Sequence, residues 1–367
     1  MIKYVSTWFL LLLVSGCAFL LPTRSITRRN SGVPSKYLRG TFHVHSIFSN
    51  DSRAQLSRIV EFSEDFALDF VIITDHNTLV GQETYRTMER TQSPMLIFGD
   101  EISTDDGHLI ALGIKEGPPP GMSSQMLIDW IHENGGYAVV AHPFSKKRPW
   151  TNWQLRGIDG MEIYNFGHTL YETNKLKLLG TGLFFLPTSF LNVSRKLSAD
   201  TFKFWDELQG NDPVVGLAAT DAHLKLLDLP PMRGVFRQAL RSVTLYVPSD
   251  RFNEHAVLRN LMSGNSFMVF ESLGIAPNFS FSAKTSVKTY QSGETITTKL
   301  PLTFFVEAPG AYEIRLLRDG TIVEKTRDEI LTSPVIRPGA YRVEVYRRTK
   351  PWILTNPIYV NQVGNSS

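Results

Sequence analysis

Histidine and acidic residues recur near the ends of successive β-like runs, and this placement constrains the fold more than any other feature. The first run, 41–46, carries His43 and His45 two positions apart. Because side chains alternate faces along a strand, both imidazoles leave the strand on the same side. Later runs carry Asp75 and His76, Asp100 and Glu101, His108, His142, and Asp221 and His223. The sequence therefore predicts that these side chains collect at one edge of a sheet.

Such a collection of ionisable groups predicts bound metal ions. Burying unpaired charges costs on the order of several kcal/mol per group, and divalent cations remove that cost. Mixed imidazole and carboxylate donors suit zinc, manganese or iron better than calcium. With eight or nine candidate ligands, more than one metal is expected, and we predict two or three divalent ions.

The first two thirds of the chain alternate β-like and helical patterns. The predicted strands are 41–46, 71–75, 95–103, 108–114, 137–143, 160–164, 214–220 and 243–247, and the predicted helices are 55–67, 122–134, 198–209 and 254–263. Ser198 is a plausible N-cap of the third helix. This alternation indicates an α/β fold with a parallel sheet or barrel, whose site gathers where strands end. The segment 180–197 fits no repeat unit; it is either an insertion over the site mouth or a core strand with a loop.

The pattern changes after about residue 273. Short alternating runs separated by turn residues follow, and no histidine occurs after His255. The predicted strands are 278–283, 302–308, 312–318, 339–346 and 357–360. This pattern is typical of a small antiparallel β-sandwich. We expect residues 274–367 to form an accessory domain with a structural or binding role.

Composition limits the classes of function. The 367 residues are 42% hydrophobic, which is enough for a large core and unlike a disordered chain. The length allows two domains. The formal net charge is only +3, whereas a nucleic-acid-binding surface would require a concentrated basic stripe. We therefore expect a small-molecule substrate and no nucleic-acid partner.

The N-terminus predicts export and a lipid anchor. Lys3 precedes an apolar run, 8–14, that is too short to span a membrane as one helix. The following Ser15-Gly16-Cys17 resembles the lipobox of bacterial lipoproteins, in which the cysteine is lipidated. Residues 1–16 would then be a signal peptide, Cys17 the lipidation site, and 17–38 a flexible tether. The alternatives are an ordinary signal peptide or an anchor helix with an incidental cysteine.

This reading predicts a location in the bacterial cell envelope, with membrane attachment through acyl chains. Ala18 after the cysteine favours the outer membrane or the periplasmic side, if the sorting habit of enteric bacteria applies.

Taken together, the motifs resemble the PHP (polymerase and histidinol phosphatase) family of metal-dependent phosphoesterases. The matching stretches are His43-Val44-His45, Thr74-Asp75-His76-Asn77, Gly99-Asp100-Glu101, Gly107-His108, Ala141-His142-Pro143 and Thr220-Asp221-Ala222-His223. The resemblance covers about residues 39–273. The closing stretch 351–360 is similar to the ending of the carbaryl-hydrolase-like (CehA/McbA) branch.

The resemblance implies a distorted seven-stranded, TIM-like β/α barrel that holds three metals. His43, His45, Asp221 and a bridging Glu101 would hold the first metal. Glu101, His108 and His142 would hold the second. His76, His223 and an acid after the first motif would hold the third. We assign that acid to Asp51, since the amide of Asn50 is a poor ligand for a hard cation, although Asp51 lies one residue beyond the family's usual position.

The implied reaction is attack on phosphorus by a hydroxide that bridges two metals. Asp221 and His223 are the catalytic candidates, because they could relay a proton. Lys146, Arg148 and His168 are candidates for substrate binding; the alternative for the two basic residues is a solvated loop. Two other functions remain open: hydrolysis of a carboxylic ester, carbamate or amide at the same site, or ligand binding without catalysis.

Overall fold

The computed structural model describes residues 36–88, 93–173, 197–210, 213–224, 230–249, 251–299, 301–335 and 337–361. The first part contains β1 (Tyr37–Val44), α2 (Leu56–Asp65), β2 (Phe70–His76), α3 (Val80–Thr87), β3 (Met95–Thr104), β4 (Gly107–Leu112), α4 (Ser124–Glu133), β5 (Tyr137–Val140), β6 (Gly160–Asn165), α5 (Phe166–Glu172), α8 (Ala199–Glu207), β7 (Val215–Ala219), α9 (Pro230–Ala239), β8 (Thr244–Pro248), α10 (Glu254–Met262), β9 (Phe267–Val269) and the 3₁₀ helix η1 (Glu271–Leu273). The predicted Cys17 site, the signal peptide and nearly all of 180–197 lie outside the described residues.

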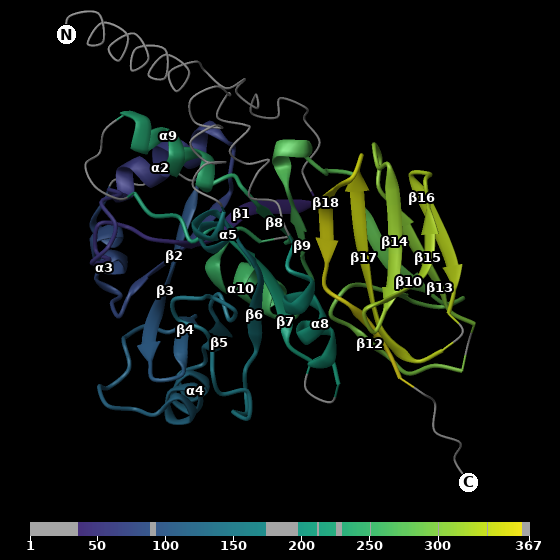
Figure 1. Cartoon of the computed structure of the whole chain (residues 1–367), viewed down its shortest axis with the longest axis horizontal. Helices are drawn as coiled ribbons and strands as arrows, with labels where there is room; N and C mark the ends of the chain where they lie inside the picture. Colours follow the sequence, from purple (N-terminus) through teal and green to yellow (C-terminus); the bar gives the residue numbers. More distant parts are fainter. Residues whose placement is uncertain are drawn as a thin grey trace, which may run out of the picture.

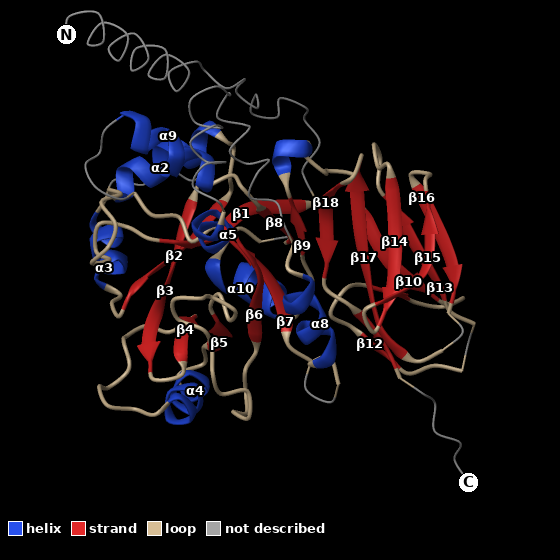
Figure 2. Cartoon of the chain, in the orientation of Figure 1, coloured by secondary structure: helices blue, strands red, loops and turns tan. Residues whose placement is uncertain are grey.

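The second part is built from strands. It contains β10 (Ser280–Lys284), β11 (Thr289–Tyr290), β12 (Thr295–Ile296), β13 (Thr303–Glu307), β14 (Glu313–Arg318), β15 (Thr321–Thr326), β16 (Ile330–Pro334), β17 (Gly339–Arg347), β18 (Lys350–Thr355) and β19 (Ile358–Val360). Figure 1 shows this part to one side of the helix-containing part, and Figure 2 shows that the helices of the described residues lie in the latter.

The fold is mixed α/β, and its large sheet is not purely parallel. Strands β1, β2 and β3 run parallel, as do β5, β6 and β7. Between these groups, β4 runs antiparallel to both β3 and β5. The expectation of a parallel sheet is therefore wrong for this region. Only two residues separate β3 from β4, and so short a connection can join only antiparallel strands.

The two ends of the strand series β1–β7 meet. The backbone nitrogen of Thr220 donates to the oxygen of Phe42 at 2.9 Å. The backbone nitrogen of His45 donates to the oxygen of Ala222 at 3.0 Å. Because Thr220 and Ala222 directly follow β7, the carboxyl ends of β1 and β7 lie side by side. This contact gathers the ends of strands that are distant in sequence.

The large sheet continues into the C-terminal part. β9 pairs with β18, and from there the sheet extends through β17 and β19 to β12. A second, antiparallel sheet has the order β11-β10-β13-β16. The sequence predicted a separate sandwich, whereas one of its two β layers is continuous with the first part. A shared hydrophobic core reflects this continuity, since Tyr37, Tyr246 and Phe267 pack among the C-terminal residues.

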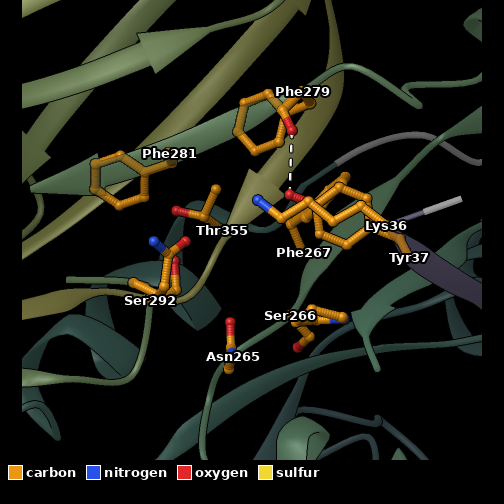
Figure 3. A pocket seen from close by; sticks show the side chains of 11 residues that line it. Lys36, Tyr37, Asn265, Ser266, Phe267, Phe279, Phe281, Ser292 and Thr355 are labelled. Carbon is orange, nitrogen blue, oxygen red and sulfur yellow. Dashed lines mark hydrogen bonds between the residues drawn. The ribbon is translucent and has the colours of Figure 1, made fainter. Parts of the chain in front are cut away.

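Polar contacts also join the two parts. Arg342 of β17 is buried and donates to both carboxylate oxygens of Asp206 of α8, at 2.9 and 3.0 Å. Near this junction lies a cavity of about 170 Å³ whose walls include Tyr37, Phe267 and Phe279 (Figure 3). The Tyr37 hydroxyl donates to the carbonyl of Phe279 across one wall. None of the nine candidate ligands lines this cavity.

The strand and helix predictions for the first part agree with the structure to within a few residues at most boundaries. Ser198 caps α8 as expected, because its side chain accepts from the backbone nitrogen of Thr201. The sequence analysis missed α3, α5, α9 and β9. Among the described residues, no helix has both the length and the apolar character needed to cross a bilayer.

Candidate metal centre

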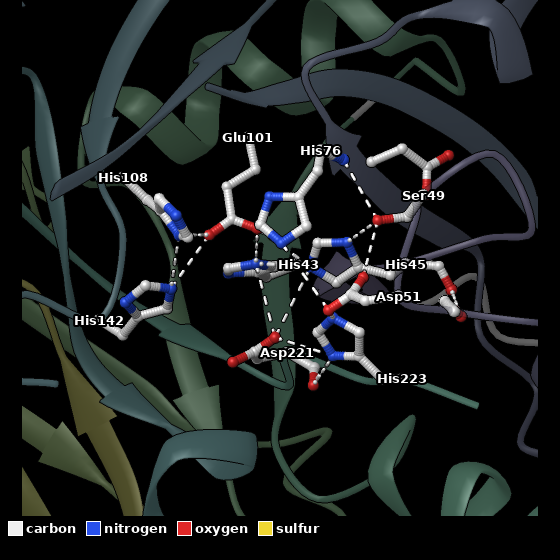
Figure 4. Close-up of polar contacts among 12 residues, drawn as sticks. His43, His45, Ser49, Asp51, His76, Glu101, His108, His142, Asp221 and His223 are labelled. Carbon is white, nitrogen blue, oxygen red and sulfur yellow. Dashed lines mark hydrogen bonds and ion pairs between the residues drawn. The ribbon is translucent and has the colours of Figure 1, made fainter. Parts of the chain in front are cut away.

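Nine side chains converge where the strands of the first part end (Figure 4). They are the same nine that the sequence analysis selected: His43, His45, Asp51, His76, Glu101, His108, His142, Asp221 and His223. His43, His45 and Glu101 are almost completely buried, and Asp51 is the most exposed of the nine with 38% of its side chain accessible. The site therefore has a closed floor and one open side.

Glu101 of β3 lies at the centre of the cluster. Its Oε2 is 3.1 Å from Nε2 of both His43 and His45 and 3.3 Å from Nδ1 of His76. Its Oε1 is 2.7 Å from Nδ1 of His108 and 3.0 Å from Nε2 of His142. One carboxylate thus faces five imidazoles, and its two oxygens contact different imidazoles.

The donor atoms form three groups that share members. The first group is His43, His45 and Asp221; the second is His76, Glu101 and His108; the third is His45, Asp51, His76 and His223. Within each group the ligating atoms lie within 4.8 Å of one another. His142 extends the second group, since its Nε2 is 3.4 Å from Nδ1 of His108.

The backbone is unusual at three of these positions. His43, His142 and Asp221 have positive φ angles of 65°, 26° and 46°. Side-chain-bearing residues adopt such angles rarely, and each instance costs about 1–3 kcal/mol. Residues held in this way commonly occur at functional sites, where the surrounding structure fixes them. Two imidazoles and a carboxylate of the cluster are thus carried by backbone in this rare conformation.

The charges in the cluster are strongly coupled. Burial lowers the pKa of His45, and neighbouring His223 lowers it further, to about 3. Burial acts in the same direction on His223, but Asp221 and Asp51 outweigh it and raise the pKa of His223 to about 10. Burial would raise the pKa of Glu101, yet His43 and the other facing imidazoles hold it well below the usual value. In the absence of metal, the cluster therefore contains ionised carboxylates beside both neutral and protonated imidazoles.

The donor set fits divalent metal ions. Nε2 of His43 lies 3.0 Å from Nε2 of His45, so two nitrogen lone pairs converge unless a cation or a proton lies between them. Buried Nδ1 of His142 has no hydrogen-bond partner among the described residues, and the contact of buried Nε2 of His223 is with Oδ2 of Asp51 at 2.9 Å. Imidazole nitrogens with carboxylate oxygens are the donors preferred by zinc, manganese and iron.

Two further acids support the cluster without belonging to it. Asp75 accepts from the backbone nitrogen of Ser46 at 2.6 Å and from its hydroxyl at 2.5 Å, which fixes the turn after the first motif. Glu162 of β6 lies 2.5 Å from Nδ1 of His43. Sequence patterns could not connect Glu162 with His43, which lies 119 positions earlier.

The predicted substrate-binding residues lie outside the nine. Nζ of Lys146 is highly exposed and lies 3.2 Å from Oε1 of Glu172. Nε2 of His168 lies 3.5 Å from Oε2 of the same carboxylate. Arg148 is exposed. Burial lowers the pKa of His168, and the charges of Glu172, His142 and Asp221 also act on it, which indicates that this imidazole lies close to the cluster.

Comparisons with known proteins give distant similarities. No family model matches the chain. An uncharacterised protein, MJ1587 of Methanocaldococcus jannaschii, is 28% identical over 153 residues, which cover 38% of this chain and 90% of that protein.

Two solved structures are similar at low identity. One is a two-domain protein from Bacteroides vulgatus, described as containing a predicted PHP-like metal-dependent phosphoesterase, with 14% identity, a TM-score of 0.46, and coverage of 90% of this chain and 99% of that one. The other is an amidohydrolase from Chromobacterium violaceum, with 15% identity, a TM-score of 0.36, and coverage of 58% and 99%. We therefore infer function from the nine residues themselves.

Proposed function

We propose that this protein is a metal-dependent hydrolase of the PHP type, and that it cleaves phosphoesters. The single observation that carries the proposal is the position of Glu101, whose two oxygens face separate groups of imidazoles at 2.7–3.3 Å. A carboxylate shared in this way is suited to bridging two cations. The proposal includes closure of β1–β7 into a distorted seven-stranded barrel, supported by the hydrogen bonds between Phe42, His45 and the residues after β7.

The ligand assignment follows the three groups. His43, His45, Asp221 and Glu101 would hold one metal, and Glu101, His108 and His142 a second. His76, His223 and Asp51 would hold a third, with Nε2 of His223 only 2.9 Å from Oδ2 of Asp51. Divalent ions bound there supply Lewis acidity and lower the pKa of water from about 15.7 towards 7.

Asp221 and His223 are proposed to hold and move the proton during turnover. Nδ1 of His223 lies 3.1 Å from Oδ1 of Asp221, which is within hydrogen-bonding distance. Asp221 carries a pKa well below its usual value, because His223 and His43 outweigh the effect of burial. The carboxylate is therefore ionised and can accept a hydrogen bond from Nδ1 of His223, which orients this pair for proton transfer.

Substrate binding is proposed to involve His168, Lys146 and Arg148 at the open side of the site. Two cations there would match the charge of a phosphate group that metals do not hold. The contact between Lys146 and Glu172 favours a second candidate function, because a lysine already paired with an acid attracts an anion less strongly. That second function is hydrolysis of an uncharged carboxylic ester, carbamate or amide.

Turnover assays separate the two functions. The soluble fragment from about residue 30 is assayed on p-nitrophenyl phosphate, bis-p-nitrophenyl phosphate and p-nitrophenyl acetate, with and without manganese. Metal-dependent release of p-nitrophenol from either phosphoester supports the leading proposal. Turnover of the acetate alone supports the second function. A protein with bound metal that turns over none of the three would argue against both as general activities.

We also propose that Cys17 is lipidated and holds the protein at the bacterial cell envelope. The support is the lipobox-like Ser15-Gly16-Cys17 after an apolar run. In a bacterial expression host, replacing Cys17 with Ser should move the protein from the membrane fraction to the soluble fraction. Retention of Cys17→Ser in the membrane fraction would contradict the lipid anchor.

A further inference from the structure

Glu162 is a buried acid that none of the three candidate metal groups includes. Its side chain is 0% exposed, as is that of His43. Oε1 of Glu162 lies 2.5 Å from Nδ1 of His43. Oε2 accepts from the backbone nitrogen of His142 at 2.7 Å and from Nδ2 of Asn165 at 2.8 Å. A buried carboxylate would be costly without such partners, and two of its three partners belong to candidate ligands.

We propose that Glu162 is a positioning residue that sets the proton of His43 and so makes its Nε2 a metal ligand. The inference rests on the proposed metal-dependent function. When Nδ1 donates its proton to Glu162, the lone pair on Nε2 points to the side where His45 and Glu101 lie. A hydrogen bond of this kind fixes both the tautomer and the orientation of a ligating imidazole.

The same carboxylate links two of the metal groups. Through Oε1 it holds the ring of His43, a member of the first group. Through Oε2 it holds the backbone of His142, which serves the second group. Both residues have positive φ angles, so each needs an external contact that keeps its strained backbone in place. Glu162 supplies one such contact to each.

Asn165 determines which atoms of this network donate. Its Oδ1 accepts from the backbone nitrogen of His168 at 2.7 Å, so its Nδ2 must be the atom that faces Glu162. Oε2 of Glu162 therefore receives two N–H groups, and Oε1 receives a third from His43. A glutamine at this position could not satisfy all three donors, because one end of its side chain is itself an N–H donor.

The substitution Glu162→Gln tests this role of Glu162, because it keeps the size of the side chain and replaces one acceptor oxygen by an N–H donor. If the amide nitrogen faces His43, it favours the tautomer with the proton on Nε2, which cannot bind metal. If the amide nitrogen faces the other way, it opposes the N–H groups of His142 and Asn165. Loss of such a supporting contact weakens metal binding by about 10–100-fold, and we expect this loss at the sites of His43 and His142 but not at the site of Asp51.

The matched control is Glu271→Gln, which makes the same change at another buried acid. Glu271 binds Arg39 at 2.7 Å and Tyr246 at 2.6 Å, and it contacts none of the nine candidate ligands. We expect this variant to unfold at a lower temperature and yet to bind zinc with wild-type affinity. A loss of affinity caused only by general destabilisation would appear in both variants.

The experiment is titration of the metal-free protein with zinc against a chromophoric chelator, for the wild type and both variants. Weaker binding at some sites of Glu162→Gln, with Glu271→Gln unchanged, supports the inference. Wild-type affinity in Glu162→Gln, or equal losses in both variants, overturns it while leaving the proposed function in place. If the wild type itself binds no zinc, manganese or iron, the proposed function fails and the inference fails with it.

A second measurement does not depend on any variant folding. Long-range ¹⁵N–¹H spectra of the zinc-loaded wild type report which imidazole nitrogen carries the proton. For His43 we expect a proton on Nδ1 and metal on Nε2. The reverse arrangement would overturn the assigned role of Glu162.

Discussion

Metal binding should release protons and strengthen as the pH rises, chiefly because of His223. In the metal-free protein Asp221 and Asp51 raise the pKa of this imidazole from 6.5 to about 10 against the opposing effect of burial. At pH 7 the imidazole is therefore protonated, and it must lose that proton before it can bind a cation.

The size of this pH effect on metal affinity follows from the raised pKa of His223. Removing a proton at pH 7 from a group with a pKa of about 10 costs about 3 × 1.36, or ~4 kcal/mol. This corresponds to a roughly 1000-fold weaker affinity at pH 7 than at pH 10, or about tenfold per pH unit. His43 and His142, whose pKa values are also raised by nearby carboxylates against the effect of burial, should add further protons.

The stability of the metal-free protein should depend on pH in the opposite direction to its metal affinity. Because the folded pKa of His223 lies above its unfolded value, its contacts stabilise the metal-free protein fully below about pH 6.5. That contribution is lost as the pH rises towards 10. Metal-free protein should therefore lose stability with rising pH over the range in which metal binding gains affinity.

Calorimetric titration tests this directly. Zinc is added at pH 7.0 in two buffers with different ionisation enthalpies, and the difference in apparent enthalpy gives the number of protons released. We expect between one and three protons per protein, and an affinity that rises about tenfold per unit from pH 6.5 to 8.5. A pH-independent affinity with no proton release would refute the electrostatic account of the cluster.

Three further outcomes are expected. Asp51→Asn should remove one metal from the bound total and leave the others, as measured by metal analysis after gel filtration; an unchanged total would exclude Asp51 as a ligand. Lys146→Ala should raise KM for a phosphoester by a few-fold with little change in kcat, and an unchanged KM would argue for a solvated loop. Arg342→Ala should lower the free energy of unfolding by about 3–5 kcal/mol, because it removes the buried cation that pairs with the half-buried Asp206 and leaves buried Glu344 with the Tyr346 hydroxyl as its partner. Denaturant unfolding with Arg342→Lys as the milder comparison measures this, and a loss below about 1 kcal/mol would show that the contact contributes little.

The candidate site could be predicted from sequence because its residues follow strand ends. A buried strand such as 71–75 is visible as a β-branched, apolar run, and Asp75 and His76 stand where it ends. Eight of the nine residues that converge in the structure stand at or beside such runs, whereas Asp51 was assigned only through the family resemblance. Their common location follows from the fold, since the carboxyl ends of neighbouring parallel strands lie at one edge.

Other features of the fold and of the site cannot be recognised from the sequence. Hydrophobic periodicity does not encode strand direction, so the antiparallel β4 was missed although its position was correct. Helix α9 was missed because it begins at Pro230-Pro231. Prolines usually predict the end of a helix, although they are compatible with its first turn. Glu162 and His43 are 119 positions apart, and no local pattern links them. The continuity of the large sheet through β9 and β18 likewise depends on a long-range pairing.

The central claim is that the cluster around Glu101 binds catalytic metal. The most direct measurement is metal content per protein, by mass spectrometry of purified wild type and of a His43→Ala/His45→Ala variant loaded under the same conditions. We expect two or three divalent ions in the wild type, and in the variant a loss of at least one ion together with all phosphoester turnover, while the fold is retained. Equal metal content in the two proteins would contradict the account.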